Sequence, residues 1–108
     1  MLSIYPWPID ALIVSPGVKL EYEKIIGLTD ALDSNFVYTA WKAGEETRLL
    51  SNQVKNIEDN NKIIITIPLS PYRCPPGPYE GASLIANYIK KNNIKSTVLV
   101  LDANQKIV

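Results

Sequence analysis

The sequence contains no histidine and a single cysteine, Cys74, among its 108 residues. Without histidine the chain lacks the commonest general base and metal ligand, so we do not expect metal chemistry. One cysteine cannot form an internal disulfide. Neither sign of charge is in excess, because 11 Lys and Arg residues balance 11 Asp and Glu residues. A neutral chain offers no basic field to a polyanion, which excludes nucleic acid as a partner.

Long apolar runs are also absent from the sequence. No stretch approaches the roughly 20 residues that a membrane-spanning helix needs, so we expect no membrane span. Residues 1–8 lack the charged and apolar regions of a signal peptide, and their two prolines predict an irregular or edge segment. We therefore expect no targeting signal in this chain. The length and a hydrophobic content of 46% predict one small core.

Two apolar runs, residues 63–67 and 97–101, predict β-strands. Neither run alternates with polar residues, so we expect both faces of each strand to be buried, as in a parallel sheet covered by helices. Between them an apolar stripe at helical spacing predicts a helix that begins near Pro78 and ends at Asn92. The order of these elements predicts an α/β fold, a partial Rossmann-like unit with parallel strands and one βαβ crossover.

The first half of the chain predicts less regular elements. Residues 9–14 are a short apolar run that predicts a strand, and the small residues 15–17 predict the turn that ends it. Residues 18–38 lack clean periodicity and predict a connection with a short helical turn near Ala31. Residues 45–57 have apolar side chains at helical spacing and acidic side chains in the first turn, which predicts a helix.

The loop after the first strand of the βαβ unit does not carry the Gly-x-Gly-x-x-Gly pattern of a dinucleotide-binding turn. It contains Pro75, Pro76 and Pro78, which have no backbone N–H to donate to a pyrophosphate. The loop therefore argues against NAD(P) as a ligand. Asp102 ends the second strand, where an acid could bind a ribose, but this loop favours a strand-end aspartate that starts a turn with Asn104.

Cys74 is the candidate reactive residue. It lies just before a predicted helix N-terminus and beside Arg73, and this positive setting stabilises a thiolate. The alternative is an inert, partly buried thiol. The residue pattern alone leaves both interpretations open.

The block Pro-Tyr-Arg-Cys-Pro-Pro-Gly-Pro-Tyr-Glu-Gly-Ala-Ser-Leu-Ile-Ala at residues 71–86 is specific enough to indicate a family. It resembles the second nucleotide-binding-like domain in the flavoprotein subunit of flavocytochrome c sulfide dehydrogenases. The resemblance extends to residues 10–17, 40–50 and 98–102, and thus over most of the chain. It implies an internal fragment of a longer flavoprotein that is similar to the FAD-dependent pyridine nucleotide-disulfide oxidoreductases.

The resemblance also implies an organisation and an activity. Residues 1–58 would be the tail of an FAD-binding segment with a linking helix, and residues 59–108 the first βαβ unit of the second domain. The implied activity is FAD-dependent oxidation of sulfide in the periplasm, with electron transfer to a cytochrome c subunit. Cys74 would be the catalytic cysteine, which in the family pairs with a second cysteine that this chain lacks. The residues implied to lie near the flavin are Pro16, Gly17, Tyr72 and Pro75.

Two other functions stay open for a chain of this length. One is a truncated structural module without catalytic activity, which self-associates as a homodimer or larger species because a two-strand sheet needs further cover. The other is a small thiol oxidoreductase that uses Cys74. Since no glycine-rich phosphate loop is present, we expect the chain on its own to be inactive as a sulfide dehydrogenase and to retain no FAD.

Overall fold

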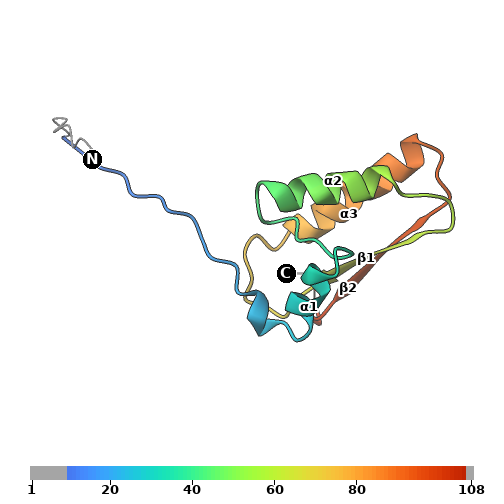
Figure 1. The fold of residues 1–108 in the computed structure, drawn as a ribbon. Helices are drawn as coiled ribbons and strands as arrows, with labels where there is room; N and C mark the ends of the chain where they lie inside the picture. The colour runs from blue at the N-terminus through green and yellow to red at the C-terminus, as the bar shows by residue number, and fades with distance from the viewer. Residues whose placement is uncertain (1–9, 107–108) are drawn as a thin grey trace.

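The structure is a computed structural model that describes residues 10–106. The segment at residues 1–8, for which the sequence predicts an irregular course, lies outside the described residues. The regular elements, in chain order, are η1 (Tyr22–Lys24), α1 (Leu28–Asp33), α2 (Glu45–Lys55), β1 (Lys62–Ile67), α3 (Gly77–Lys91) and β2 (Thr97–Asp102). Figure 1 shows α2 and α3 lying near the β1–β2 pair, and α1 with η1 near one end of it.

The strands β1 and β2 pair in parallel, with Lys62 opposite Thr97 and Ile67 opposite Asp102. Because parallel neighbours need a crossover, α3 connects the end of β1 to the start of β2. This confirms the predicted α/β fold with one βαβ unit. Pro78 lies in the first turn of α3, and Asn93 follows the helix end with a φ of 54°. The sequence signals for both ends of this helix were therefore correct.

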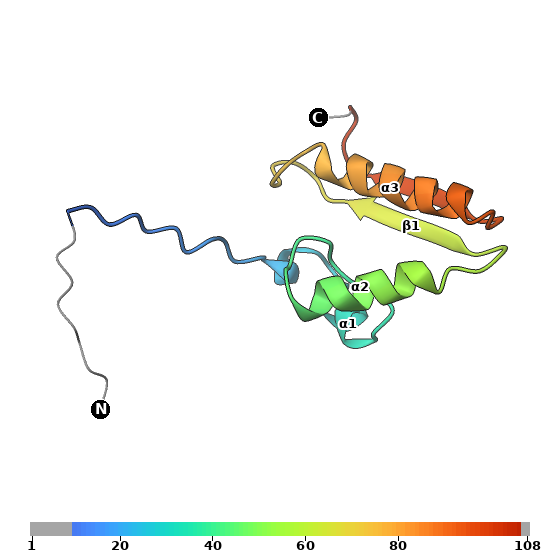
Figure 2. The same ribbon diagram turned by 90° about the horizontal axis from the view of Figure 1, so that it is seen from above.

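The helix α3 packs against both strands, and the core lies at this contact (Figure 2). Among the described residues, Ile67 and Ile89 are the buried hydrophobic side chains, with 2% and 6% of their surface exposed. On the other face of the sheet Ile64, Leu99 and Leu101 are 55%, 41% and 54% exposed. The expectation that both faces are buried is wrong for this chain, because α3 covers one face and no described element packs on the other.

The predicted strand at residues 9–14 does not form in its described part. Residues 11–20 have no regular structure, and most of this segment extends away from the rest of the chain, as the blue segment in Figure 1 shows. Leu12, Ile13 and Val14 are 75%, 91% and 75% exposed. A strand needs a neighbour for its backbone hydrogen bonds, and in residues 10–106 the two paired strands are β1 and β2. The local pattern suits a strand, but no partner lies beside it.

The two helical predictions for the first half are confirmed. The helix α1 contains Ala31, where the sequence predicts a helical turn. The helix α2 begins at Glu45 as predicted and ends at Lys55, two residues before the predicted end, with Asn56 at the cap position. Across residues 10–106 no helix combines the length and the apolar character that a membrane crossing requires.

Candidate functional site

The loop that carries Cys74 spans residues 68–76, and we call it the Cys74 loop. It leaves the carboxyl end of β1 and leads directly into α3. In open α/β sheets this end of the strands is where ligands bind. The Cys74 thiol is exposed, and the Cys74 carbonyl accepts a hydrogen bond from the Gly77 N–H at 2.9 Å. The thiol is thus exposed to solvent at the carboxyl end of the strands, where ligand binding is expected.

The backbone of Cys74 adopts an uncommon conformation. Its φ is 56°, in the left-handed region, where a side chain with a Cβ costs about 1–2 kcal/mol. The other described residues with positive φ are glycines or asparagines, which tolerate this region better. A strained backbone at a chemically versatile residue is a feature of functional sites. Sequence reasoning did not identify this feature.

The predicted flavin-contacting residues fall into two groups. Tyr72 and Pro75 lie together in the Cys74 loop, where the Tyr72 hydroxyl donates to the Pro75 carbonyl at 3.5 Å, a weak bond. Pro16 and Gly17 are exposed in the irregular segment, and Gly17 has a φ of 79° with nothing within 4 Å of the position of a Cβ. Within residues 10–106 no hydrogen bond joins this turn to the Cys74 loop. The structure brings Cys74, Tyr72 and Pro75 together and leaves the other two residues apart.

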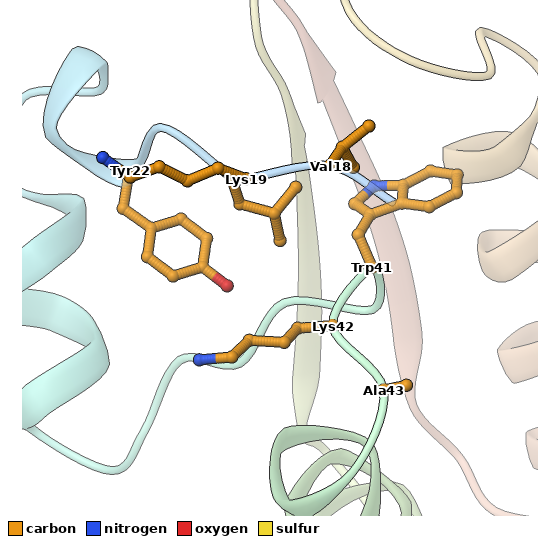
Figure 3. A pocket seen from close by; sticks show the side chains of 7 residues that line it. Val18, Lys19, Tyr22, Trp41, Lys42 and Ala43 are labelled. Carbon is orange, nitrogen blue, oxygen red and sulfur yellow. The ribbon is translucent and has the colours of Figure 1, made fainter. Parts of the chain in front are cut away.

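An open hollow of about 350 Å³ lies between the segment that leads into η1 and the loop that precedes α2. It is lined by Val18, Lys19, Leu20, Tyr22, Trp41, Lys42 and Ala43. In Figure 3 Val18 and Trp41 lie on one side of it, with Tyr22 and Lys42 on the other. Sequence reasoning missed this hollow, because its two walls come from segments without regular periodicity.

The Trp41 ring connects the hollow to the Cys74 loop. A Cβ on Gly77 would lie 2.2 Å from Cη2 and 2.7 Å from Cζ2 of Trp41, so the ring rests directly on the first residue of α3. Gly77 follows the Cys74 loop and donates its N–H to the Cys74 carbonyl. The aromatic wall of the hollow and the backbone of Cys74 therefore meet at one glycine.

The charges in the hollow are largely paired. The Lys42 ammonium lies 2.9 Å from Glu46 Oε1 and 5.9 Å from the centre of the Tyr22 ring. The Tyr22 hydroxyl also donates to the Glu46 carboxylate at 3.4 Å. Burial, followed by the Glu46 charge, raises the pKa of Tyr22, and the hydrogen bond to Glu46 raises the pKa of Lys42. The hollow thus combines aromatic and aliphatic walls with two lysines, Lys19 and Lys42, that pair with Glu23 and Glu46.

A hydrogen-bond network closes the carboxyl end of β2. Asp102 Oδ1 accepts from the Asn104 backbone N–H at 2.8 Å and from Asn104 Nδ2 at 2.7 Å. The other carboxylate oxygen accepts from the Tyr79 hydroxyl. The bond from Tyr79, followed by those from Asn104, lowers the pKa of Asp102, and the bond to Asp102 raises the pKa of Tyr79 to about 12. The predicted turn between Asp102 and Asn104 is confirmed, and both oxygens of the carboxylate are engaged.

Two other charged residues, Arg48 and Glu80, lie on the surface. Arg48 pairs with Glu45 on the exposed face of α2, and Glu80 lies in the first turn of α3, where the helix dipole favours it. In residues 10–106 neither side chain makes a hydrogen bond or ion pair to the Cys74 loop, although the Glu80 backbone N–H donates to the Pro76 carbonyl at 3.0 Å. In the same part of the chain no cluster of three metal-ligating side chains is present.

Comparison with known proteins gives two consistent matches. Residues 47–108 match the family described as "Sulfide dehydrogenase [flavocytochrome c] flavoprotein chain, central". The chain is also similar to "Sulfide:quinone oxidoreductase, mitochondrial" of Dictyostelium discoideum, with 27% identity over 89 residues that cover 82% of this chain and 20% of the relative. The chain thus spans about a fifth of the length of that curated relative.

The family match covers more than half of the chain and includes the Cys74 loop, α3 and both strands. These are the elements that carry the network around Asp102 and the strained backbone of Cys74. The match and the βαβ fold agree with each other, and the chain belongs to the flavocytochrome c sulfide dehydrogenase flavoprotein family.

Proposed function

We propose that this chain supplies the redox-cysteine loop of an FAD-dependent flavoprotein that oxidises sulfide. The observation that carries the proposal is the exposed thiol of Cys74, held in a left-handed backbone conformation at the carboxyl end of β1. Membership in the sulfide dehydrogenase family supports sulfide as the substrate. Because the chain spans a fifth of its relative, the activity belongs to the whole flavoprotein, and this chain alone is expected to be inactive.

The residues present fit one part of FAD. The hollow beside Trp41 has aromatic and aliphatic walls, and Gly17 leaves its backbone open to close approach. These features suit the flavin ring. The Cys74 loop does not suit the pyrophosphate, because its prolines lack N–H groups and the Gly77 N–H already bonds to the Cys74 carbonyl. By analogy with the family we propose ring contacts from Pro16, Gly17, Tyr72 and Pro75, which do not line this hollow, and no phosphate contacts from the Cys74 loop.

The chemistry proposed for Cys74 is thiol–disulfide exchange. Hydrosulfide attacks one sulfur of a disulfide of which Cys74 forms one half, an S–S bond to the incoming sulfur forms, and the partner thiolate leaves. The exposed loop position admits this small nucleophile. Bound FAD supplies a two-electron acceptor that can pass electrons on one at a time. Such single-electron steps are what a cytochrome c subunit requires.

The setting of this activity is proposed from the same relationships. We propose that residues 1–58 belong to the tail of the FAD-binding segment and its linking helix, and residues 59–108 to the second nucleotide-binding-like domain. We further propose a cytochrome c subunit as partner and the periplasm as location, by analogy with the family. The Dictyostelium relative is mitochondrial and named for a quinone, so a quinone acceptor is the competing assignment.

A second function is favoured by the open sheet face. Ile64, Leu99 and Leu101 are exposed on one side of the β1–β2 pair, and an uncovered apolar face promotes association. A structural module that self-associates as a homodimer would bury this face without any catalysis. Use of Cys74 by a small stand-alone thiol oxidoreductase has no comparable support, because no second thiol or histidine is present in the sequence to complete the exchange.

The reaction of an activated Cys74 with sulfide tests the proposed function. The full chain is first converted at its single cysteine to a mixed disulfide with an aromatic thiol, which absorbs light on release. Sulfide is then added, and the released thiol is followed by absorbance while mass spectrometry shows whether Cys74 gains one sulfur atom. We expect the folded chain to react at least as fast as the urea-unfolded chain. A folded chain that reacts much more slowly would show that the loop shields the thiol and would contradict the proposal.

A further inference from the structure

The Cys74 loop is anchored at its first residues by one side chain from beyond β2. The Ser70 backbone N–H donates to Asn104 Oδ1 at 2.9 Å, and Asn104 Nδ2 donates to the Pro68 carbonyl at 3.0 Å. Asn104 therefore satisfies a donor and an acceptor of the loop backbone at the same time. These bonds join residues more than 30 positions apart in the sequence, so they fix how the loop leaves the sheet.

The far end of the loop is anchored by Asp102. Tyr79 lies in the first turn of α3, three residues after the loop ends, and its hydroxyl donates to one oxygen of the Asp102 carboxylate. The other oxygen accepts both the backbone and side-chain N–H groups of Asn104. The two anchors are thus joined to each other. Together, Tyr79, Asp102 and Asn104 form a closed connection from one end of the Cys74 loop to the other, which we call the clamp.

We propose that Asp102 and Asn104 are positioning residues that hold the Cys74 loop across the carboxyl end of β1 through this clamp. The clamp rests on the proposed function in one respect: the proposed function says what the thiol that the clamp positions does. A loop fixed at both ends restricts the range of positions of Cys74, and the left-handed backbone of Cys74 is a conformation that such restraint can maintain. The clamp also occupies Asp102, so a ribose at this site would have to displace Tyr79.

The opposite end of the sheet offers a matched control. There Asp59 Oδ1 accepts the Lys95 backbone N–H at 2.7 Å, and Ser96 donates to the Glu58 carbonyl at 2.6 Å. These bonds also connect the segments before and after the crossover, over similar sequence separations. They lie at the start of β1 and β2 rather than at the Cys74 loop. Loss of the Asp59 bond therefore weakens the same strand pair without releasing the clamp.

Two readouts on the full chain test the clamp. The first is amide hydrogen exchange of Gly77, whose N–H bonds to the Cys74 carbonyl and is not a partner of the clamp side chains. The second is the electron paramagnetic resonance spectrum of a nitroxide attached to Cys74, the single cysteine of the chain. Asn104→Ala releases the first anchor, the conservative change Tyr79→Phe releases the second, and Asp59→Ala is the control.

We expect Tyr79→Phe, which loses one hydrogen bond, to speed exchange of the Gly77 amide relative to Asp59→Ala by about 2- to 13-fold. Asn104→Ala loses three side-chain hydrogen bonds and should speed this exchange at least as much. The nitroxide spectrum should sharpen in both clamp variants and stay as in the parent chain in the control. The proposal is overturned if Tyr79→Phe and Asn104→Ala leave both readouts unchanged, or if Asp59→Ala changes them equally.

If Asn104→Ala does not fold, Tyr79→Phe still decides, because it removes one hydroxyl and no packing atoms. Neither readout involves sulfide or flavin. Failure of the clamp proposal would appear in the amide exchange and the nitroxide spectra. Failure of the proposed function would appear in the reaction of the activated Cys74 disulfide with sulfide, so the two outcomes can be distinguished.

Discussion

The contact between Trp41 and Gly77 leads to a quantitative prediction for two glycines of the same helix. Gly77 begins α3, and Gly81 lies one turn further along it. Replacing a helical glycine by alanine stabilises a protein by about 0.5–1 kcal/mol where the new methyl group has space. A Cβ at Gly81 would meet nothing within 4 Å, whereas a Cβ at Gly77 would lie 2.2 Å from the Trp41 ring. The two substitutions should therefore differ in sign.

The size of the difference follows from what the Trp41 ring must do. Carbon atoms in contact lie about 3.5–4 Å apart, so the ring must move by more than an ångström to admit a methyl group. Trp41 is 48% exposed, and a fully covered tryptophan buries about 200 Å². Complete loss of its covered half would cost about 2.5 kcal/mol at 25 cal/mol per Å². Since the ring need not leave completely, we expect Gly77→Ala to be less stable than Gly81→Ala by about 1–2 kcal/mol.

Urea unfolding followed by circular dichroism measures both stabilities. In a Trp7→Phe background the fluorescence comes from Trp41 alone, because the sequence contains two tryptophans. Its emission should shift to longer wavelength in Gly77→Ala and stay unchanged in Gly81→Ala. In a Trp41→Ala background the two alanine variants should become equally stable. The contact between Trp41 and Gly77 would be refuted if Gly77→Ala and Gly81→Ala were equally stable with Trp41 present and the Trp41 emission did not change.

Five further predictions follow from the site, the sheet and the sequence of the Cys74 loop. Cys74→Gly should be more stable than Cys74→Ala by about 1 kcal/mol in urea unfolding, since both remove the thiol and only glycine adopts the left-handed backbone without cost; equal stability would contradict that conformation. Tyr79 should ionise near pH 12 by phenolate absorbance, and Asp102→Asn should return it toward the ordinary tyrosine pKa. Because the pKa of Asp102 is lowered and that of Tyr79 is raised, the hydrogen bond between them should contribute its full stabilisation at pH values between the ordinary pKa of an aspartate and the ordinary pKa of a tyrosine. This stabilisation should fall as pH drops through the folded pKa of Asp102 and as pH rises toward 12, whereas the double variant of Tyr79→Phe with Asp102→Asn should lose both dependences. The purified chain should show no flavin absorbance after extensive dialysis, and stoichiometric flavin would disprove this. Light scattering should give a mass above that of the monomer, and Ile64→Glu with Leu101→Glu should lower it; a monomer at high concentration in the parent chain would remove the argument.

The βαβ unit could be predicted from the sequence because its signals are local. Two uninterrupted apolar runs, a stripe at helical spacing, Pro78 in the first turn and asparagines at the end each constrain the backbone directly. The same applies to the turn between Asp102 and Asn104, which are two residues apart. The position of Cys74 between β1 and α3 followed from these elements. The candidate site could therefore be placed correctly, at the carboxyl end of the strands.

The remaining features depend on partners that lie far away in the sequence. The run at residues 9–14 has the composition of a strand, but its pairing depends on a neighbour that residues 10–106 do not provide. An apolar run without alternation cannot show which face is covered, and here Ile64 faces solvent while Ile67 is buried. The bond between Ser70 and Asn104 leaves no signal in either residue type. The same holds for the contact of Trp41 with Gly77.

The parallel pairing of β1 with β2 has a consequence for how the chain folds. Lys62 and Thr97 can pair only after the Cys74 loop, α3 and the following turn have brought the strands together. Closing so long an intervening segment is costly in entropy while it is unstructured, and α3 shortens the effective distance once it has formed. We therefore expect helix formation to precede strand pairing, so that variants which weaken α3 slow folding, whereas variants at Asn104 chiefly speed unfolding.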